Sequence, residues 1–188
     1  TPMNGIIGMT EVALRPDQTE DKRIECLKKI DSASGYLLGI LNDVLDMSKI
    51  ESGKMKLVID KCSIPDMMKN IDSIMDAKMN EKDITFVQNI TLLHDWYYGD
   101  ELRLNQILVN LLSNAVKYSN LGGHVDLTVK ELPVDEKHSD IYFAVKDNGI
   151  GIPESKQQLI FQRFEQADDL ANARKQGTGL GLAISSRL

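Results

Sequence analysis

Three polar side chains recur at helical spacing near the middle of the sequence. Asn110, Asn114 and Lys117 lie at intervals of four and three residues, so on a helix they form one polar line. Asparagine is a mediocre helix former, and two asparagines one turn apart in a leucine-rich helix need a reason. Exposure to solvent is one reason. The other is chemistry, because an amide oxygen can bind Mg²⁺, which adds water and phosphate to few protein oxygens, while Lys117 contacts phosphate.

A second pattern, Asp147-x-Gly149-x-Gly151, comes directly after a predicted strand. Two glycines after a carboxylate allow the backbone to come close to a flat ligand. Asp147 can then accept a hydrogen bond from an exocyclic amine, while Ile150 and Ile152 line an apolar slot. Alone, this pattern is weak, because many tight turns look the same.

A third pattern places glycines at alternate positions before the last predicted helix: Gly177, Gly179 and Gly181, with Thr178 and Leu180 between them. Glycines at a helix N-terminus expose amide donors that favour phosphate. The spacing differs from the Rossmann fingerprint, and no Gly-Lys-Ser/Thr comes after it as in a Walker loop.

Between the second and third patterns lie two phenylalanines and a polar loop. Phe161 and Phe164 are three residues apart, and we expect them to be core anchors at the base of a lid. Arg174 and Lys175 belong to the polar loop, where solvated surface charge is the simplest interpretation.

The order of these patterns is more specific than any one of them. It strongly resembles the N, G1, F and G2 boxes of the Bergerat-fold ATP-binding domain of sensor histidine kinases. Residues 110–119 read NLLSNAVKYS, which is close to that family's pattern throughout. Residues 1–8 resemble the segment just after the phosphoacceptor histidine in the family's dimerisation domain, and residues 42–51 resemble the end of that domain's second helix. The similarity is closest to the hybrid type.

The resemblance implies a kinase core that binds ATP and Mg²⁺ and transfers the γ-phosphoryl group to a histidine, and onward to a response-regulator aspartate. By resemblance, Asn114 binds Mg²⁺, Asn110 supports the triphosphate, Lys117 contacts phosphate, Tyr118 stacks near the adenine, and Asp147 takes its amino group. The glycines of the second pattern allow close approach to the base, and those of the third pattern hinge the lid. The other implied ATP-binding residues are Gly149, Gly151, Ile152, Phe161, Phe164, Arg174, Lys175, Gly177, Thr178, Gly179, Leu180 and Gly181.

The chain departs from the family's pattern at both ends. The phosphoacceptor histidine falls just before the position of Thr1, and His94, His124 and His138 do not replace it. We therefore expect no catalytic residue in this chain, which should bind ATP without phosphorylating itself. The family also adds a closing β-hairpin after the position of Leu188, so we expect the final strands to be missing.

The elements that position these residues indicate an α+β chain. Residues 1–53 predict a helical hairpin, either an ordinary one or half of a dimeric four-helix bundle, with Gly53 as a left-handed stop. Residues 54–188 predict a Bergerat-type sandwich with a mixed sheet. Its expected strands are 55–59, 84–90, 125–132 and 141–145, and its expected helices begin at Ser63, Asp100, Gln157 and Gly179. The helix that begins at Ser63 carries an apolar stripe rich in methionine, which should lie in the core. Its residues are Ile64, Met67, Met68, Ile71, Ile74, Met75 and Met79.

Composition excludes several classes of function. The 188 residues are 42% hydrophobic and carry a net charge of −6, which disfavours a broad nucleic-acid surface. Two cysteines without metal or disulfide spacing fit a reducing compartment, so we expect a cytoplasmic chain. No apolar stretch is long enough to span a bilayer, so any membrane attachment should involve regions outside the chain. The expected partners are a response-regulator receiver domain and a second copy, paired through residues 1–53.

Two alternatives remain open. Gyrase-like and chaperone-like ATPases of this fold carry a glutamate one turn before the magnesium-binding asparagine, where this chain has Asn110. An amide cannot act as a general base, which favours transfer over hydrolysis. The other alternative is a non-catalytic nucleotide-binding dimerisation module, which the intact boxes disfavour.

Overall fold

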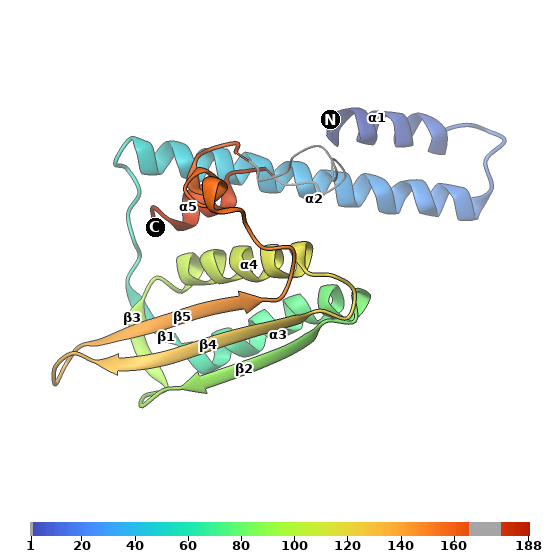
Figure 1. The fold of residues 1–188 in the computed structure, drawn as a ribbon. Coiled ribbons are helices and arrows are strands. Elements are labelled where there is room, and N and C mark those ends of the chain that lie inside the picture. The colour runs from blue at the N-terminus through green and yellow to red at the C-terminus, as the bar shows by residue number, and fades with distance from the viewer. Residues whose placement is uncertain (1, 166–177) are drawn as a thin grey trace. The chain divides into compact units, whose positions relative to one another are not determined.

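A computed structural model describes residues 2–165 and 178–188 (Figure 1). The chain divides into two compact units, Thr1–Met55 and Lys56–Leu188. The described part of the first unit contains helices alone, and the second combines helices with strands.

The first unit is a helical hairpin of α1 (Pro2–Ala13) and α2 (Glu20–Glu51). Thr19 begins α2 as its N-cap, with its hydroxyl accepting a hydrogen bond from the Lys22 amide at 3.4 Å. Gly53 ends α2 with a φ of 63°, and the Lys54 amide bonds back to the Lys49 carbonyl at 2.9 Å. This is a Schellman motif. The predicted hairpin and its glycine stop are confirmed.

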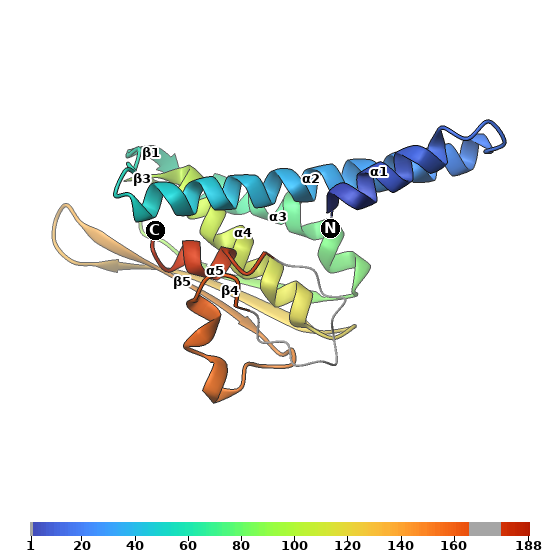
Figure 2. The same ribbon diagram turned by 90° about the horizontal axis from the view of Figure 1, so that it is seen from above.

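The second unit is a mixed sheet with helices on one face (Figures 1 and 2). The sheet order is β2-β4-β5, with β2 parallel to β4 and β4 antiparallel to β5, while β1 and β3 form a separate antiparallel pair. The predicted α+β class with a mixed sheet is confirmed. The elements are β1 (Asp60–Ser63), α3 (Ile64–Glu81), β2 (Thr85–Thr91), β3 (Trp96–Gly99), α4 (Glu101–Tyr118), β4 (His124–Pro133), β5 (Ser139–Asp147), the 3₁₀ turns η1 (Glu154–Lys156) and η2 (Leu159–Phe161), and α5 (Gly181–Ser185).

The core lies between the sheet and α3 and α4. Alternate residues of β4 point into it, and Val125, Leu127 and Val129 are fully buried. The methionine-rich stripe of α3 packs against them, as predicted from its helical spacing. Ile74 is the exception, because it lies at the margin of the stripe and its side chain is 51% exposed.

Three element predictions are corrected. Residues 55–59 form no strand: Leu57, Val58 and Ile59 are all exposed, and the pairing partner β3 spans only residues 96–99, which pair with 60–63. The backbone of this segment bonds to a side chain and not to a strand: the Val58 amide donates to the Asp100 carboxylate at 2.9 Å. The predicted helix at 157–161 consists of 3₁₀ turns, and the last helix begins at Gly181.

The two isoleucines of α3 provide a matched test of this core. Ile71→Ala should lower the free energy of unfolding by about 2–5 kcal/mol, because Ile71 is fully buried. Ile74→Ala removes the same atoms from an exposed position and should cost about 1 kcal/mol or less. Urea unfolding followed by fluorescence of Trp96, which lies in the same unit, measures both. Equal losses would contradict this packing.

Candidate functional site

The helix that carries the polar line is fixed at its start by Asp100. The Asp100 carboxylate accepts a hydrogen bond from the Arg103 amide at 3.1 Å, as an N-cap does. The apolar face of α4 then packs into the core through Leu108, Leu112 and Ala115. With this face buried, the rotation of the helix and the position of its polar line are set.

The polar line on α4 is half-buried, so simple exposure to solvent does not account for the two asparagines. The Asn114 amide nitrogen lies 3.5 Å from Asn110 Oδ1, and the Asn110 amide nitrogen donates to Ser185 Oγ at 2.9 Å. Lys117 Nζ donates to the Tyr118 hydroxyl at 3.0 Å and lies 4.7 Å from the centre of that ring. The asparagines are therefore held in place by neighbouring polar groups.

Gly181 lets α5 approach this line closely. A Cβ atom at Gly181 would stand 2.3 Å from Asn110 Oδ1, a distance that real Cβ atoms essentially never show. Gly179 is needed for a similar reason: its φ is 68°, and a Cβ there would stand 2.8 Å from Phe164 Cα. The Phe164 amide also donates to the Gly179 carbonyl at 3.0 Å. Two glycines of the third sequence pattern thus have packing roles, while Gly177 lies outside the described residues.

The turn after β5 rests on the other end of α4. The Asp147 carboxylate accepts a hydrogen bond from the Gly149 amide at 2.9 Å, and the Ile150 amide donates to the Tyr118 carbonyl at 3.3 Å. A Cβ at Gly149 would stand 2.4 Å from that carbonyl oxygen. Gly151 has a φ of 69°, which favours glycine. The turn that carries Asp147 is therefore docked on the last residue of α4.

These contacts bring part of the predicted set to one helix. Asn114 lies one turn before Tyr118, which contacts the Asp147 turn, and one turn after Asn110, which contacts α5. The Thr178 hydroxyl accepts a hydrogen bond from the amide of the buried Leu180.

Several predicted residues do not join this group. Phe161 and Phe164 are 50% and 69% exposed, so the expectation that they are core anchors is wrong. Phe161 ends the short turn η2, and Phe164 lies beyond it with a left-handed φ of 61°, so one regular element does not carry both rings. Ile152 is 44% exposed. Arg174 and Lys175 lie outside the described residues.

The donor set of the site suits a metal that needs few protein ligands. Among the described residues, no group of three or more His, Cys, Asp and Glu side chains could hold a metal ion. The Asn114 side chain offers an amide oxygen to a metal, and phosphate and water would be the other ligands. That is the coordination Mg²⁺ accepts, so the residues present fit it.

Two residues of the site were missed from the sequence. Asn148 ties the Asp147 turn to the start of β4, because its side-chain oxygen accepts from the His124 amide at 2.8 Å. Lys82, at the end of α3, donates to backbone carbonyls at the end of α4. Asn148 could have been suspected from its place inside the Asp-x-Gly pattern. Lys82 gave no signal, because its partners lie more than thirty residues away.

The described part of the second unit also has a groove between α3 and β2. It shares no residue with the site on α4. Its lining residues are Asp72, Ser73, Asp76, Met79, Asn80, Ile84, Phe86 and Gln88.

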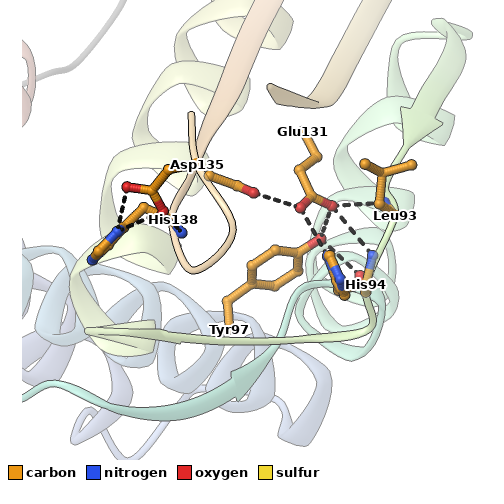
Figure 3. Close-up of polar contacts among 7 residues, drawn as sticks. Leu93, His94, Tyr97, Glu131, Asp135 and His138 are labelled. Atoms are coloured by element: carbon orange, nitrogen blue, oxygen red, sulfur yellow. Dashed lines mark hydrogen bonds and ion pairs between the residues drawn. The ribbon is translucent and has the colours of Figure 1, made fainter. Parts of the chain in front are cut away.

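A second polar cluster surrounds Glu131 on β4 (Figure 3). Its carboxylate is 1% exposed and accepts hydrogen bonds from the Tyr97 hydroxyl, the Ser139 hydroxyl and the Leu93 amide, each at 2.7 Å. His94 Nδ1 lies 2.9 Å from the same carboxylate. Burial acts to raise the pKa of Glu131, but these hydrogen bonds outweigh it and hold the pKa at about 2. Burial and the bond to Glu131 raise the pKa of Tyr97 to about 12.

This cluster lies at the other end of the sheet from the Asp147 turn. Glu131 pairs with Ile141, whereas Asp147 pairs with Val125. Glu131 lies six residue steps along β4 from Val125, which is roughly 20 Å. The cluster therefore fastens the segment before β3 to β4 and β5, and is structural.

Comparison with known proteins identifies the family. Residues 1–53 match the His Kinase A (phospho-acceptor) domain, and residues 99–188 match the histidine kinase-, DNA gyrase B- and HSP90-like ATPase domain. The chain belongs to the sensor histidine kinase family. The signal transduction histidine-protein kinase BarA of Escherichia coli K12 is 36% identical over all of this chain, which covers 20% of BarA. The hybrid signal transduction histidine kinase B of Dictyostelium discoideum is 38% identical over all of this chain, which covers 10% of it.

A solved histidine kinase structure shares the fold. The full-length ShkA structure in complex with AMPPNP matches 99% of this chain and 37% of its own, with a TM-score of 0.72 and 30% identity. This histidine kinase chain thus spans about a fifth or less of the BarA and histidine kinase B sequences. None of its described helices is both long and apolar enough to cross a membrane.

Lowering the pH should remove the stabilising contribution of Glu131. Its pKa is about 2 in the folded chain against an ordinary 4.5, so the contribution is present above about 4.5 and is lost as the pH falls toward 2. Glu131→Gln should lower the free energy of unfolding at neutral pH. The gap in this free energy between the variant and the unmodified chain should narrow on acidification. Urea unfolding at several pH values measures this, with the exposed Glu136→Gln as the control. A gap that stays constant with pH would contradict the assignment.

Proposed function

We propose that this chain is the ATP-binding catalytic core of a two-component sensor histidine kinase. It transfers the γ-phosphoryl group of ATP to a histidine nitrogen, from which the group passes to a response-regulator aspartate. One observation carries the proposal: in a chain of this family, α5 contacts Asn110 of the half-buried polar line, and the Asp147 turn docks on Tyr118 at the end of the same helix.

Each side chain on α4 has a role that its chemistry supports. The amide oxygen of Asn114 would hold Mg²⁺, and Asn110, anchored by Ser185, would support the triphosphate. Lys117 contributes positive charge toward phosphate. Tyr118 stacks near the adenine, and Asp147 accepts the hydrogen bond of its amino group. Mg²⁺, when bound, neutralises charge on the phosphates, and phosphoryl transfer depends mainly on such positioning and neutralisation.

The remaining ATP contacts belong to the glycine segments and the loop between them. Gly149 and Gly151 let the turn approach the base, while the Gly177–Gly181 segment hinges the lid and presents amides to phosphate. The other proposed contact residues are Ile152, Phe161, Phe164, Arg174, Lys175, Thr178 and Leu180.

We infer that the phosphate acceptor is a histidine that precedes Thr1. The match of residues 1–53 to a phospho-acceptor domain supports this. The three histidines of the chain already bond to carboxylates of the second unit: His94 to Glu131, His124 to Asp126 and His138 to Asp135. The 188-residue chain by itself would then bind ATP without phosphorylating itself.

The proposed partners are a second copy of the chain and a response-regulator receiver domain. Large apolar side chains remain exposed along the hairpin: Met3, Ile7, Leu14, Ile24, Leu27, Leu38, Leu41, Val44 and Leu45. Pairing of two hairpins into a four-helix bundle would bury such a surface. The net charge of −6 argues against a nucleic-acid partner. We place the domain in the cytoplasm, with any membrane attachment through regions outside it.

A chain extended upstream to include the candidate histidine tests the proposed function. Incubated with Mg²⁺-ATP, it should gain phosphate that is labile in acid and stable in base, as phosphohistidine is. Asn114→Ala and Asp147→Ala should each reduce the yield by about tenfold or more, because each removes a contact to a charged or buried group.

Matched controls separate site effects from general damage. The exposed Asn70→Ala and Asp140→Ala variants should retain the yield. Release of free phosphate without labelled protein would favour the ATPase alternative. Nucleotide binding without either reaction would favour the non-catalytic module.

A further inference from the structure

The ammonium group of Lys82 holds the end of α4. It donates to the backbone carbonyls of Val116 at 2.7 Å, Lys117 at 2.9 Å and Ser119 at 3.1 Å. An ammonium has three hydrogens, and three acceptors converge on this one. The side chain is half-buried, so these contacts are partly shielded from water.

The backbone of Lys82 is itself fixed in place. Lys82 is the C-cap of α3, and the next residue, Asp83, is left-handed with a φ of 54°. The Asp83 amide bonds to the Asn80 carbonyl at 3.1 Å and the Ile84 amide to the Met79 carbonyl at 2.9 Å. This pairing is a Schellman motif. The lysine side chain therefore extends from a defined point at the end of α3.

The carbonyls that Lys82 binds belong to the last turn of α4, which carries Lys117 and Tyr118. The last carbonyls of a helix lack intrahelical partners and carry partial negative charge, so a cation stabilises them. Between the held carbonyls lies that of Tyr118, which accepts the Ile150 amide of the Asp147 turn at 3.3 Å. Motion of this helix end would move the turn with it.

We infer that Lys82 is a positioning residue for nucleotide binding. By fixing the last turn of α4, it keeps Lys117, Tyr118 and the Asp147 turn in the mutual arrangement that the nucleotide needs. This inference rests on the proposed ATP site. Lys82 acts through the backbone of α4 and not on the nucleotide.

Lys78 is a natural control for this inference. It lies one turn earlier on α3, is exposed, and reaches Ser113 Oγ in the middle of α4 at 3.5 Å. Lys78→Met removes the same charge from the same helix without removing contacts to the end of α4.

The test compares Mg²⁺-ATP affinity of the 188-residue chain by calorimetry, at a temperature where circular dichroism shows every variant to be folded. Lys82→Met should weaken binding at least about tenfold relative to Lys78→Met. Lys82→Arg, which keeps charge and donors, should recover most of the affinity, and Lys82→Gln should fall between. If Lys82→Met does not fold, the Gln variant decides. A Lys82→Met or Lys82→Gln affinity within twofold of Lys78→Met would overturn the inference.

Amide hydrogen exchange separates positioning from a loss of global stability. Lys82→Met should speed exchange at the Ile150 amide selectively, relative to the amides of core strand β4. Uniform acceleration at all amides would overturn the inference, because it would show that Lys82 only stabilises the fold. Failure of the proposed function appears differently: the unmodified chain would not bind Mg²⁺-ATP at all.

Discussion

The candidate site depends on how closely two glycines let other segments approach α4. Any side chain at Gly149 would collide with the Tyr118 carbonyl, and any side chain at Gly181 would collide with the Asn110 amide. A side chain at Gly149 would require the α4 backbone to move, and one at Gly181 would displace the Asn110 side chain from its place in the polar line. The polar line of α4, the Asp147 turn and α5 therefore depend on these two glycines for their mutual positions. The chemistry proposed for the chain needs all three.

Two polar clusters, around Lys82 and around Glu131, stabilise the second unit in different ways. Lys82 supplies positive charge to backbone carbonyls at the end of a helix beside the site. Glu131 supplies negative charge to hydroxyl and amide donors at the far end of the sheet. Each is a buried or half-buried charge surrounded by groups of opposite polarity, which is the condition under which a charge is tolerated there. The two ends of the unit are thus fixed by charged groups, with the apolar core between them.

Much of the fold was predictable because its signals are local. The helical spacing of Ile71 and Met75 predicts the buried face of α3, and Ser63 and Asp100 mark where α3 and α4 begin. Asn110, Asn114 and Lys117 were identifiable for the same reason, since one helix places them. The features that failed depend on distant partners. Residues 55–59 alternate like a strand but lack a partner strand. The contacts of Lys82 with α4, and those of Glu131 with Leu93 and Tyr97, span more than thirty residues.

The most direct test of the proposed site uses Mn²⁺ in place of Mg²⁺ in the ATP complex of the 188-residue chain. A paramagnetic ion broadens nuclear magnetic resonance signals steeply with proximity. We predict strong broadening of the side-chain amide signals of Asn110 and Asn114 and of the Gly181 amide, while signals of the Glu131 cluster stay sharp. Broadening centred on the groove between α3 and β2, or on the Glu131 cluster, would contradict the proposed site.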